Sequence, residues 1–369
     1  MKTIWHIGAW NRNIGDWSLM YSMHRMLNEQ AQEAIHFHLI DSQRTYFHQG
    51  LVDQMNEEAD LVLVGGGGLI FHRPEDKSVS GWSFNIECEK LDQIQKPLVV
   101  YGIGYNQFAF NPPPLPEKTW CHLRKLREKA ALFTVRDSWT QEILKGKGIE
   151  SDVIPDPGIC VYDRPIEFKK DRPTIAVNLA GDRIDQRYPR VADHLPLTDA
   201  LRRALCEIVK YGYRVLMIPH LPLDHFEYRH EWERTFPEGT LRNAKYEFPY
   251  LYAPEGESLY PHVPFFGNLY RQVDLTLGMR FHSCVLALGC GTPFIPLGSH
   301  PKLKWLCEDI GISRYSLPMV SPSYDTTEKM TETIMKALLD PLLRSETERA
   351  RDQAVKELRA FNERVVSLL

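Results

Sequence analysis

The segment that joins a buried strand to a helix at residues 278–283 carries two side chains suited to binding an anion and moving a proton. It reads Gly-Met-Arg-Phe-His-Ser, with Arg280 and His282 two residues apart, and side chains at that spacing in an extended backbone point the same way. The Arg280 guanidinium is a planar fork that fits a phosphate or a carboxylate. The dipole of the following helix disfavours the charged form of His282, whereas a bound phosphate dianion would favour it. This balance predicts an anion site with a proton donor that works near neutral pH.

Four consecutive glycines at residues 65–68 follow the apolar run 61–64. Such a run costs conformational entropy on folding, so a positive φ or a close approach of a ligand to backbone N–H groups should require it. We expect the glycine run to bind an anion at Gly66 and Gly67. The alternative is that the glycines form a tight turn beneath a packed helix. The spacing matches neither a P-loop with its Lys nor the G-x-G-x-x-G dinucleotide signature.

Two more junctions between a strand and a helix carry charged residues. Residues 13–16, Asn-Ile-Gly-Asp, precede the first helix, where Asp16 is placed either to cap the helix or to take part in chemistry. Another strand ends on Arg136, and a helix cap by Asp137 or Ser138 would leave the guanidinium facing the cleft. Ligands of open α/β sheets bind outside the carboxyl ends of the strands, so we expect these junctions to meet at one site.

Three further histidines, His220, His225 and His230, follow a predicted strand, with Asp224 among them. Steps of five residues do not stack on one helix face and no H-x-x-x-H pair occurs, so we predict no metal site. We expect these side chains to be loop or rim histidines that contact a substrate.

Short apolar runs alternate with helical spacing along most of the chain. Strands are predicted at residues 4–8, 35–40, 61–64, 98–104, 132–135, 153–155, 174–179, 214–218, 273–277 and 292–297. Helices are predicted at residues 17–28, 120–129, 138–145, 197–210 and 282–288. This alternation is typical of α/β proteins with parallel sheets that are covered by helices on both faces.

The polar stretch 162–173 contains two prolines and has no periodicity, so we interpret it as a linker. We therefore predict two Rossmann-like domains whose parallel sheets face a central cleft, followed by a C-terminal helix that packs back across both. Their predicted ranges are residues 1–165, 172–340 and 341–369.

Composition and charge argue against several classes of protein for this sequence. The 369 residues carry 44 Lys plus Arg against 48 Asp plus Glu, a net charge of −4, so we expect no nucleic-acid partner. The seven scattered cysteines form no C-x-x-C pair, and neither a signal peptide nor a run of about 18 apolar residues is visible. We expect a cytoplasmic protein with free thiols. The basic run 124–127 would allow peripheral contact at the inner face of a membrane, although a solvated helix face is its commoner meaning.

Taken together, these motifs resemble the polysaccharide pyruvyl transferase family. The resemblance rests on N-I-G-D at 13–16, G-G-G-G at 65–68, L-V-V-Y-G-I-G at 98–104, V-R-D-S at 135–138, D-P at 156–157 and, above all, G-M-R-F-H-S-x-x-x-A-L-x-x-G-x-P at 278–293. The pieces are short, but their order and spacing over most of the chain make the resemblance specific.

The resemblance implies a GT-B-like fold and transfer of the enolpyruvyl group of phosphoenolpyruvate to a sugar as a pyruvate ketal, without a cofactor. It implies that Arg136, Arg280 and His282 hold the donor phosphate and that Asp16 lies in the same cleft. We expect His282 to act as the acid and Asp16 to activate or orient a hydroxyl, although the two roles are not separable from the sequence. The donor site would also include Gly66 and Gly67, and the acceptor site would include Asn13, Asp16, His72 and His220.

Two alternatives remain open. One is a GT-B glycosyltransferase that uses a nucleotide sugar, although the second half of the chain shows no acidic pair that clearly suits a ribose. The other is a non-catalytic glycan-binding protein, for which the aromatic-rich span 246–270 would serve. Whether the acceptor is a free glycan or a lipid-linked saccharide, and how the chain oligomerises, are not determined by the sequence.

Overall fold

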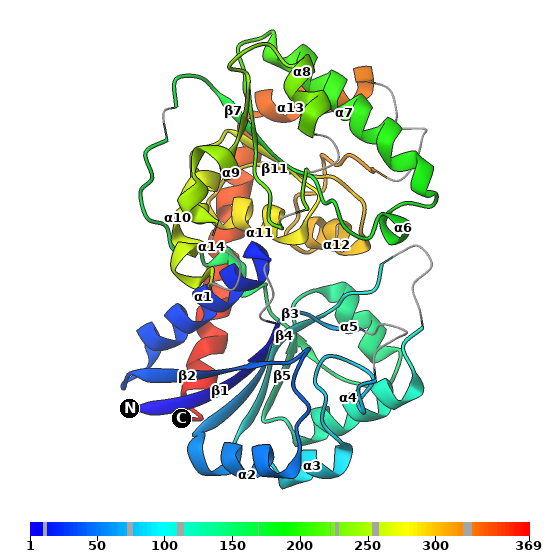
Figure 1. Cartoon of the computed structure of the whole chain (residues 1–369). Coiled ribbons are helices and arrows are strands. Elements are labelled where there is room, and N and C mark those ends of the chain that lie inside the picture. The colour runs from blue at the N-terminus through cyan, green and yellow to red at the C-terminus, as the bar shows by residue number, and fades with distance from the viewer. Residues whose placement is uncertain are drawn as a thin grey trace.

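The computed structural model describes residues 1–9, 13–71, 77–108, 114–168, 170–221, 223–225, 229–252, 258–319 and 327–369. Its strands form two sheets, one above the other in Figure 1, with strand orders β2-β1-β3-β4-β5-β6 and β11-β10-β7-β8-β9. All the strand pairs within these sheets are parallel. The predicted α/β class with two parallel sheets is therefore confirmed.

The first half of the chain builds the lower sheet of Figure 1. Its strands are β1 (Lys2–Gly8), β2 (Ile35–Asp41), β3 (Leu61–Ile70), β4 (Leu98–Tyr105), β5 (Leu132–Val135) and β6 (Asp152–Val153). Its helices are α1 (Ile14–Gln30), α2 (Gln49–Glu58), α3 (Cys88–Gln93), α4 (Glu117–Lys129) and α5 (Ser138–Lys145), followed by the 3-10 turn η1 (Pro157–Ile159). Trp5 of β1 packs with α2, α3 and α4, whereas its neighbour Ile4 packs with α1. Burial on both faces explains why the central strands β3 and β4 are continuous apolar runs, whereas the edge strands β2 and β6 are not.

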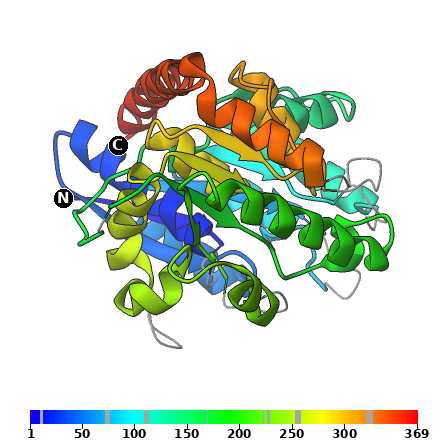
Figure 2. The ribbon, with the colours of Figure 1, turned by 90° about the horizontal axis from the view of Figure 1, so that it is seen from above.

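The second half builds the upper sheet. Its strands are β7 (Thr174–Asn178), β8 (Arg214–Met217), β9 (Leu241–Asn243), β10 (Leu275–Gly278) and β11 (Phe294–Pro296). Its helices are α6 (Ile184–Arg187), α7 (His194–Val209), α8 (Arg229–Thr235), α9 (Ala244–Glu247), α10 (Val263–Arg271), α11 (Phe281–Gly289), α12 (Pro301–Asp309) and α13 (Thr327–Leu339). Helices α7 and α13 lie side by side on one face of this sheet (Figure 2).

The last helix, α14 (Pro341–Val366), runs along both halves (Figure 1). Leu343 joins the core of the second sheet, Ala354 packs in the core that contains α11, and Phe361 packs against the first sheet. The hydroxyl of Tyr101 in β4 donates a hydrogen bond of 2.7 Å to Oδ1 of Asn362. A single helix therefore contributes to the cores of both halves.

The glycine run lies inside a strand. The predicted strand end at Val64 is wrong, because β3 continues to Ile70 with a shift of register against β4 after Gly67. Gly66 and Gly67 have φ angles of +76° and +83°, and a Cβ on Gly66 would lie 2.3 Å from Cδ1 of Leu19 in α1. Left-handed backbone and the close approach of α1 thus require glycine at Gly66.

Candidate functional site

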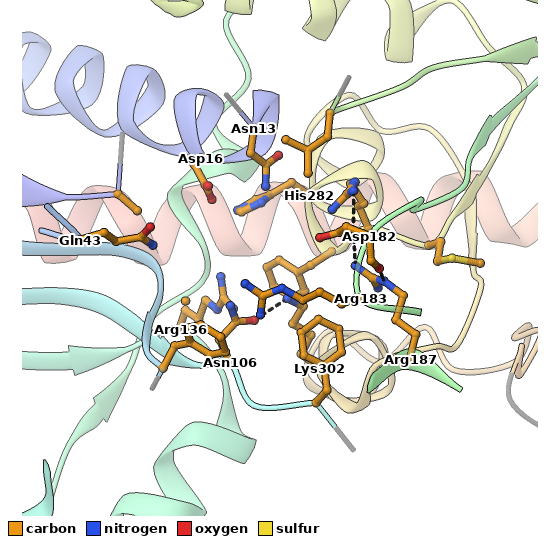
Figure 3. Close-up of a pocket in the computed structure, with 18 residues that line it drawn as sticks. Asn13, Asp16, Gln43, Asn106, Arg136, Asp182, Arg183, Arg187, His282 and Lys302 are labelled. Carbon is orange, nitrogen blue, oxygen red and sulfur yellow. Dashed lines mark hydrogen bonds and ion pairs between the residues drawn. The ribbon is translucent and has the colours of Figure 1, made fainter. Parts of the chain in front are cut away.

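One cavity of about 420 Å³ lies between the two sheets (Figure 3). Its walls come from loops that follow strands β1 to β5 of the first sheet and β7, β8, β10 and β11 of the second. Ligands bind at the carboxyl ends of parallel strands, and here two sets of such ends face one opening.

Cationic side chains from both halves line this cavity. They are Arg136 from the first half and Arg183, Arg187, Arg280 and Lys302 from the second, against the two carboxylates of Asp16 and Asp182. Burial lowers the pKa of Lys302 well below its usual range, and the nearby guanidinium groups of Arg136 and Arg187 lower it further. An anion in the cavity would relieve this repulsion, so the charge pattern favours an anionic ligand.

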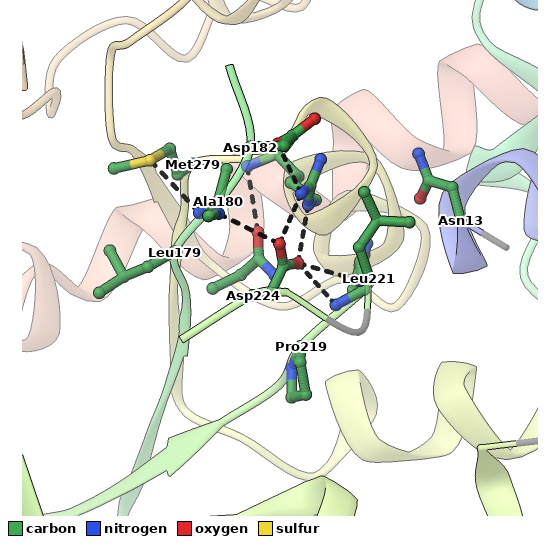
Figure 4. A network of polar contacts seen from close by, with 12 residues as sticks. Asn13, Leu179, Ala180, Asp182, Pro219, Leu221, Asp224 and Met279 are labelled. Atoms are coloured by element: carbon green, nitrogen blue, oxygen red, sulfur yellow. Dashed lines mark hydrogen bonds and ion pairs between the residues drawn. The ribbon is translucent and has the colours of Figure 1, made fainter. Parts of the chain in front are cut away.

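Arg280 is held in place by two carboxylates (Figure 4). It precedes α11, and its Nε donates to Oδ2 of Asp224 at 2.7 Å while its Nη2 donates to Oδ1 of Asp182 at 2.8 Å. Burial alone would raise the pKa of Asp224, but Arg280 holds it well below its ordinary value. Asp224 also accepts from the backbone N–H groups of His220 and Leu221. The guanidinium is therefore fixed in one orientation, with its Nε–Nη2 edge paired with Asp224.

His282 lies in the first turn of α11 and lines the same cavity as Arg280, as their spacing predicted. Its Nε2 is 3.5 Å from Oδ2 of Asp156, which belongs to the first half of the chain. On its other side, the ring touches the first turn of α1: a Cβ on Gly15 would lie 2.3 Å from Nδ1 of His282. The absence of a side chain at Gly15 is what lets the imidazole reach this position.

The start of α1 brings Asn13 and Asp16 to the cavity. Asn13 caps the helix, because its Oδ1 accepts from the backbone N–H of Gly15 at 2.9 Å. The N-cap residue is therefore Asn13 and not Asp16. Its carboxylate lies in the first turn, where the helix dipole stabilises a negative charge.

Arg136 crosses from the first half toward the second. Its side chain is 1% exposed, with Nη1 3.5 Å from Oδ2 of Asp156 and Nε 3.5 Å from Oδ2 of Asp137. Its guanidinium carbon lies 4.4 Å from the centre of the Phe281 ring. Among the described atoms, Nε and Nη2 of Arg136 have no hydrogen-bond partner. Leaving buried donors without partners is unfavourable, so a ligand oxygen that accepts a hydrogen bond from Arg136 would stabilise the site.

The other predicted site residues do not line the cavity in the part of the chain that the structure describes. His220 is buried, with Nε2 2.7 Å from the hydroxyl of Tyr270, and it is absent from the described lining of the cavity. The glycine run meets the cavity at Gly68, with Gly66 and Gly67 deeper under α1. His72 lies outside the described residues.

Several lining residues were missed by the sequence reasoning. Asp182, Arg183 and Arg187 follow β7, and Lys302 follows β11. A signal was available for Asp182 and Arg183, which lie a few residues after the predicted strand 174–179, whose carboxyl end faces the cleft. Arg183 also has a φ of +54°, and its guanidinium carbon lies 4.5 Å from the ring centre of Phe71 in the first half.

Two further statements cover only the part of the chain that the structure describes. Within it, no three or more His, Cys, Asp or Glu side chains are grouped so that they would hold a metal ion. Within the same residues, no helix combines the length and the apolar character needed to cross a bilayer.

Solved structures with this architecture are GT-B enzymes. MnaA of S. aureus in complex with UDP has 12% sequence identity and a TM-score of 0.55, covering 98% of this chain and 97% of that one. The UDP-GlcNAc 2-epimerase of Methanocaldococcus jannaschii has 11% identity and a TM-score of 0.56, covering 96% and 99%. The spinosyn forosaminyltransferase SpnP has 10% identity and a TM-score of 0.53, covering 100% and 99%. At these identities the likeness shows the fold alone, which is GT-B-like as predicted.

The sequence comparisons are more specific about the family. No curated protein matches the sequence. The family model for polysaccharide pyruvyl transferase matches residues 13–301, a span that includes Asp16, Arg136, Arg280 and His282. The chain therefore belongs to the polysaccharide pyruvyl transferase family.

Proposed function

We propose that this protein transfers the enolpyruvyl group of phosphoenolpyruvate to two hydroxyls of a glycan and forms a pyruvate ketal. The observation that carries the proposal is the meeting of Arg136 from one half with Arg280 and Lys302 from the other in one cavity, beside His282 and Asp16. Phosphoenolpyruvate carries up to three negative charges on few atoms, so cations that approach it from two sides suit it.

The reaction needs one group that donates a proton and one group that accepts protons from the acceptor hydroxyls. A proton adds to the methylene carbon of the donor, and its C2 becomes an oxocarbenium-like centre. One acceptor hydroxyl bonds to C2, the C2–O bond to phosphate breaks, and a second hydroxyl closes the ring. The two hydroxyls lose two protons: one balances the proton delivered to the methylene carbon, and the other leaves with phosphate. The balance calls for no oxidant or reductant.

Two side chains of the cavity fit these tasks. His282 is the acid that protonates the methylene carbon or the departing phosphate, and Asp16 accepts a proton from an acceptor hydroxyl or orients it. Asn13 lies beside Asp16 at the start of α1 and is placed to contact the acceptor. The cavity volume of about 420 Å³ falls in the range of ligand sites and leaves room for a sugar beside the small donor.

The test is release of inorganic phosphate from phosphoenolpyruvate with and without an added glycan. We expect release that depends on the glycan, and we expect His282→Asn to lower kcat about 10²–10⁴-fold because a general acid is lost. The matched control is His36→Asn, because His36 is exposed on β2; it should leave kcat unchanged.

A thermal-shift measurement, together with the phosphate-release assay, separates the alternatives. A donor present at 100 times its dissociation constant stabilises a protein by about 2.7 kcal/mol, which raises the thermal midpoint. Stabilisation by a nucleotide sugar together with indifference to phosphoenolpyruvate would favour a glycosyltransferase. Glycan binding without any phosphate release would favour a non-catalytic glycan-binding protein.

A further inference from the structure

Asp156 contacts two side chains of the proposed site, although the reaction above gives it no task. It precedes η1 in the first half, and its Oδ1 accepts from the backbone N–H of Gly158 at 2.9 Å, which fixes the carboxylate. Its Oδ2 lies 3.5 Å from Nε2 of His282 and 3.5 Å from Nη1 of Arg136. One carboxylate oxygen therefore faces both the proposed acid and the buried guanidinium.

The two facing atoms are buried polar atoms that lie within reach of each other. Oδ2 of Asp156 and Nε2 of His282 are both buried, and among the described atoms neither has a hydrogen-bond partner. Leaving both unpaired is unfavourable, and their separation exceeds a normal hydrogen bond by only a few tenths of an ångström. Hydrogen bonds of catalytic groups are often long before substrate binds and shorten afterwards. We therefore treat the two atoms as a hydrogen-bonded pair in the working enzyme.

This pairing settles which nitrogen of His282 meets the ligand. An ionised carboxylate only accepts hydrogen bonds, so the nitrogen that faces Asp156 must carry a hydrogen. Nδ1 is the other ring nitrogen and lies next to Gly15 at the start of α1, where Asn13 and Asp16 line the cavity. Nδ1 is then the nitrogen that is free to exchange a proton in the cavity.

We propose that Asp156 is a positioning residue that keeps a hydrogen on Nε2 of His282, so that Nδ1 delivers the proton, and that holds Arg136 in the same network. The inference rests on the proposed function for the identity of the donor. Burial by itself would raise the pKa of Asp156, but His282 and Arg136 outweigh burial and keep it below its ordinary value, so the carboxylate stays ionised. Because Asp156 belongs to the first half and His282 to the second, the acid is oriented only when the two halves are together.

Charged and titratable groups face His282 from several elements. Asp156 faces it from the start of η1, Asp16 lines the cavity from α1, and Arg280 precedes its own helix. His220, which follows β8, stays neutral near pH 7 because burial lowers its pKa to about 3. Asp156 is therefore the group whose loss should release the ring from the tautomer that carries the hydrogen on Nε2.

The first experiment is Asp156→Asn, assayed by phosphate release. We expect kcat to fall about 10²–10⁴-fold while the KM for phosphoenolpyruvate does not rise. Affinity for phosphoenolpyruvate should not weaken, because the variant removes a negative charge beside Arg136. Asp152→Asn is the matched control: Asp152 is exposed four residues earlier, and this variant should match the wild type. A merely structural role for Asp156 would lower the affinity for the donor together with kcat.

The second experiment needs no variant, so a misfolded Asp156→Asn protein cannot decide the matter. Nitrogen-15 NMR of the wild type, at a pH where His282 is neutral, should show the hydrogen on Nε2 and a bare Nδ1. A hydrogen on Nδ1, or an Asp156→Asn enzyme with the wild-type kcat, would overturn the inference. Failure of the wild type to release phosphate would instead refute the proposed function, and the NMR result would still decide whether Asp156 sets the tautomer.

Discussion

At the scale of single residues, the cations of the cavity are not equivalent. Arg280 is already paired with Asp224 and Asp182. Its charge is therefore largely compensated, and it can donate to a ligand only from one fixed orientation. Arg136 is buried with two nitrogens that lack partners among the described atoms, and Lys302 donates to Oδ1 of Asn106 at 2.8 Å across the two halves. We expect Arg136 and Lys302 to change most when an anion binds.

Lys302 should take up a proton when phosphoenolpyruvate binds. Its pKa is depressed by burial and by neighbouring guanidinium groups, and a bound anion would raise it again. At pH values between the free and the bound pKa, binding draws a proton from solution, which calorimetry in two buffers of different ionisation enthalpy measures. Lys302→Met should abolish most of this uptake, and Lys304→Met, at an exposed position of the same helix, should retain it. Equal uptake in all three proteins would show that another group titrates.

At the scale of elements, helix starts position most of the site. Asn13 caps α1, and Asp137 caps α5 by accepting from the backbone N–H of Thr140 at 2.7 Å. The Asp137 cap was one of the two predicted from the sequence, and it leaves Arg136 directed at the cavity as expected. The first turns of α1 and α11 then meet at Gly15 and His282.

The contact between α1 and α11 predicts that Gly15→Ala impairs catalysis. The added Cβ would lie 2.3 Å from Nδ1 of His282, so the ring has to move away from the position assigned to it. We expect kcat for phosphate release to fall at least about 10-fold, because small misplacements of a reacting group are costly. Gly50→Ala tests the second position of α2 in the same way, and its Cβ would meet only an ordinary contact at 3.5 Å. Similar kcat values for both variants would contradict this role of Gly15.

Gly66 and Gly148 both have a left-handed backbone, and we expect their alanine variants to lose different amounts of stability. Gly148 has a φ of +72° and nothing within 4 Å of an added Cβ, so Gly148→Ala should cost about 1–2 kcal/mol for the backbone conformation. Gly66→Ala carries the same cost plus the overlap with Leu19, about 1–3 kcal/mol more. Urea unfolding measures both free energies. Equal losses would mean that α1 moves aside without cost and that its packing does not explain the run.

At the scale of the whole molecule, the two halves are joined by side chains as well as by the chain itself. Asp309 of α12 accepts from the backbone N–H and the hydroxyl of Ser138, at 3.0 and 2.5 Å, which ties it to the start of α5. Arg183 lies over Phe71, and α14 packs against both sheets. The cavity thus depends on how the halves are held together.

Helix α14 should therefore matter to stability although it is far from the chemistry. Phe361 is buried against Tyr101 of β4, with ring centres 5.0 Å apart. Phe361→Ala should lower the free energy of unfolding by about 3–5 kcal/mol. Leu342→Ala, near the exposed start of the same helix, should change it by less than about 0.5 kcal/mol. If the Phe361→Ala loss were as small as that of Leu342→Ala, α14 would not be part of the first core.

The parts of the site that the sequence predicted are those with local signals. Apolar runs mark the strands, and the residues that follow them, such as Arg136 and His282, line the cavity. The partners of these residues were not predicted, because Asp224 and Asp156 reach Arg280 and His282 only through the tertiary fold. Arg187 was missed because α6 is only four residues long and has no periodicity to detect.

The most direct test of the central claim is calorimetric titration of phosphoenolpyruvate into the wild type, Arg136→Gln and Arg349→Gln. Arg349 is exposed on α14, which makes it a charge-matched control. If cations from both halves hold one donor, the wild type and Arg349→Gln should bind equally, and Arg136→Gln should bind at least about 10-fold more weakly, since charge-assisted hydrogen bonds are lost. Equal binding by Arg136→Gln, or no binding by the wild type, would contradict the account.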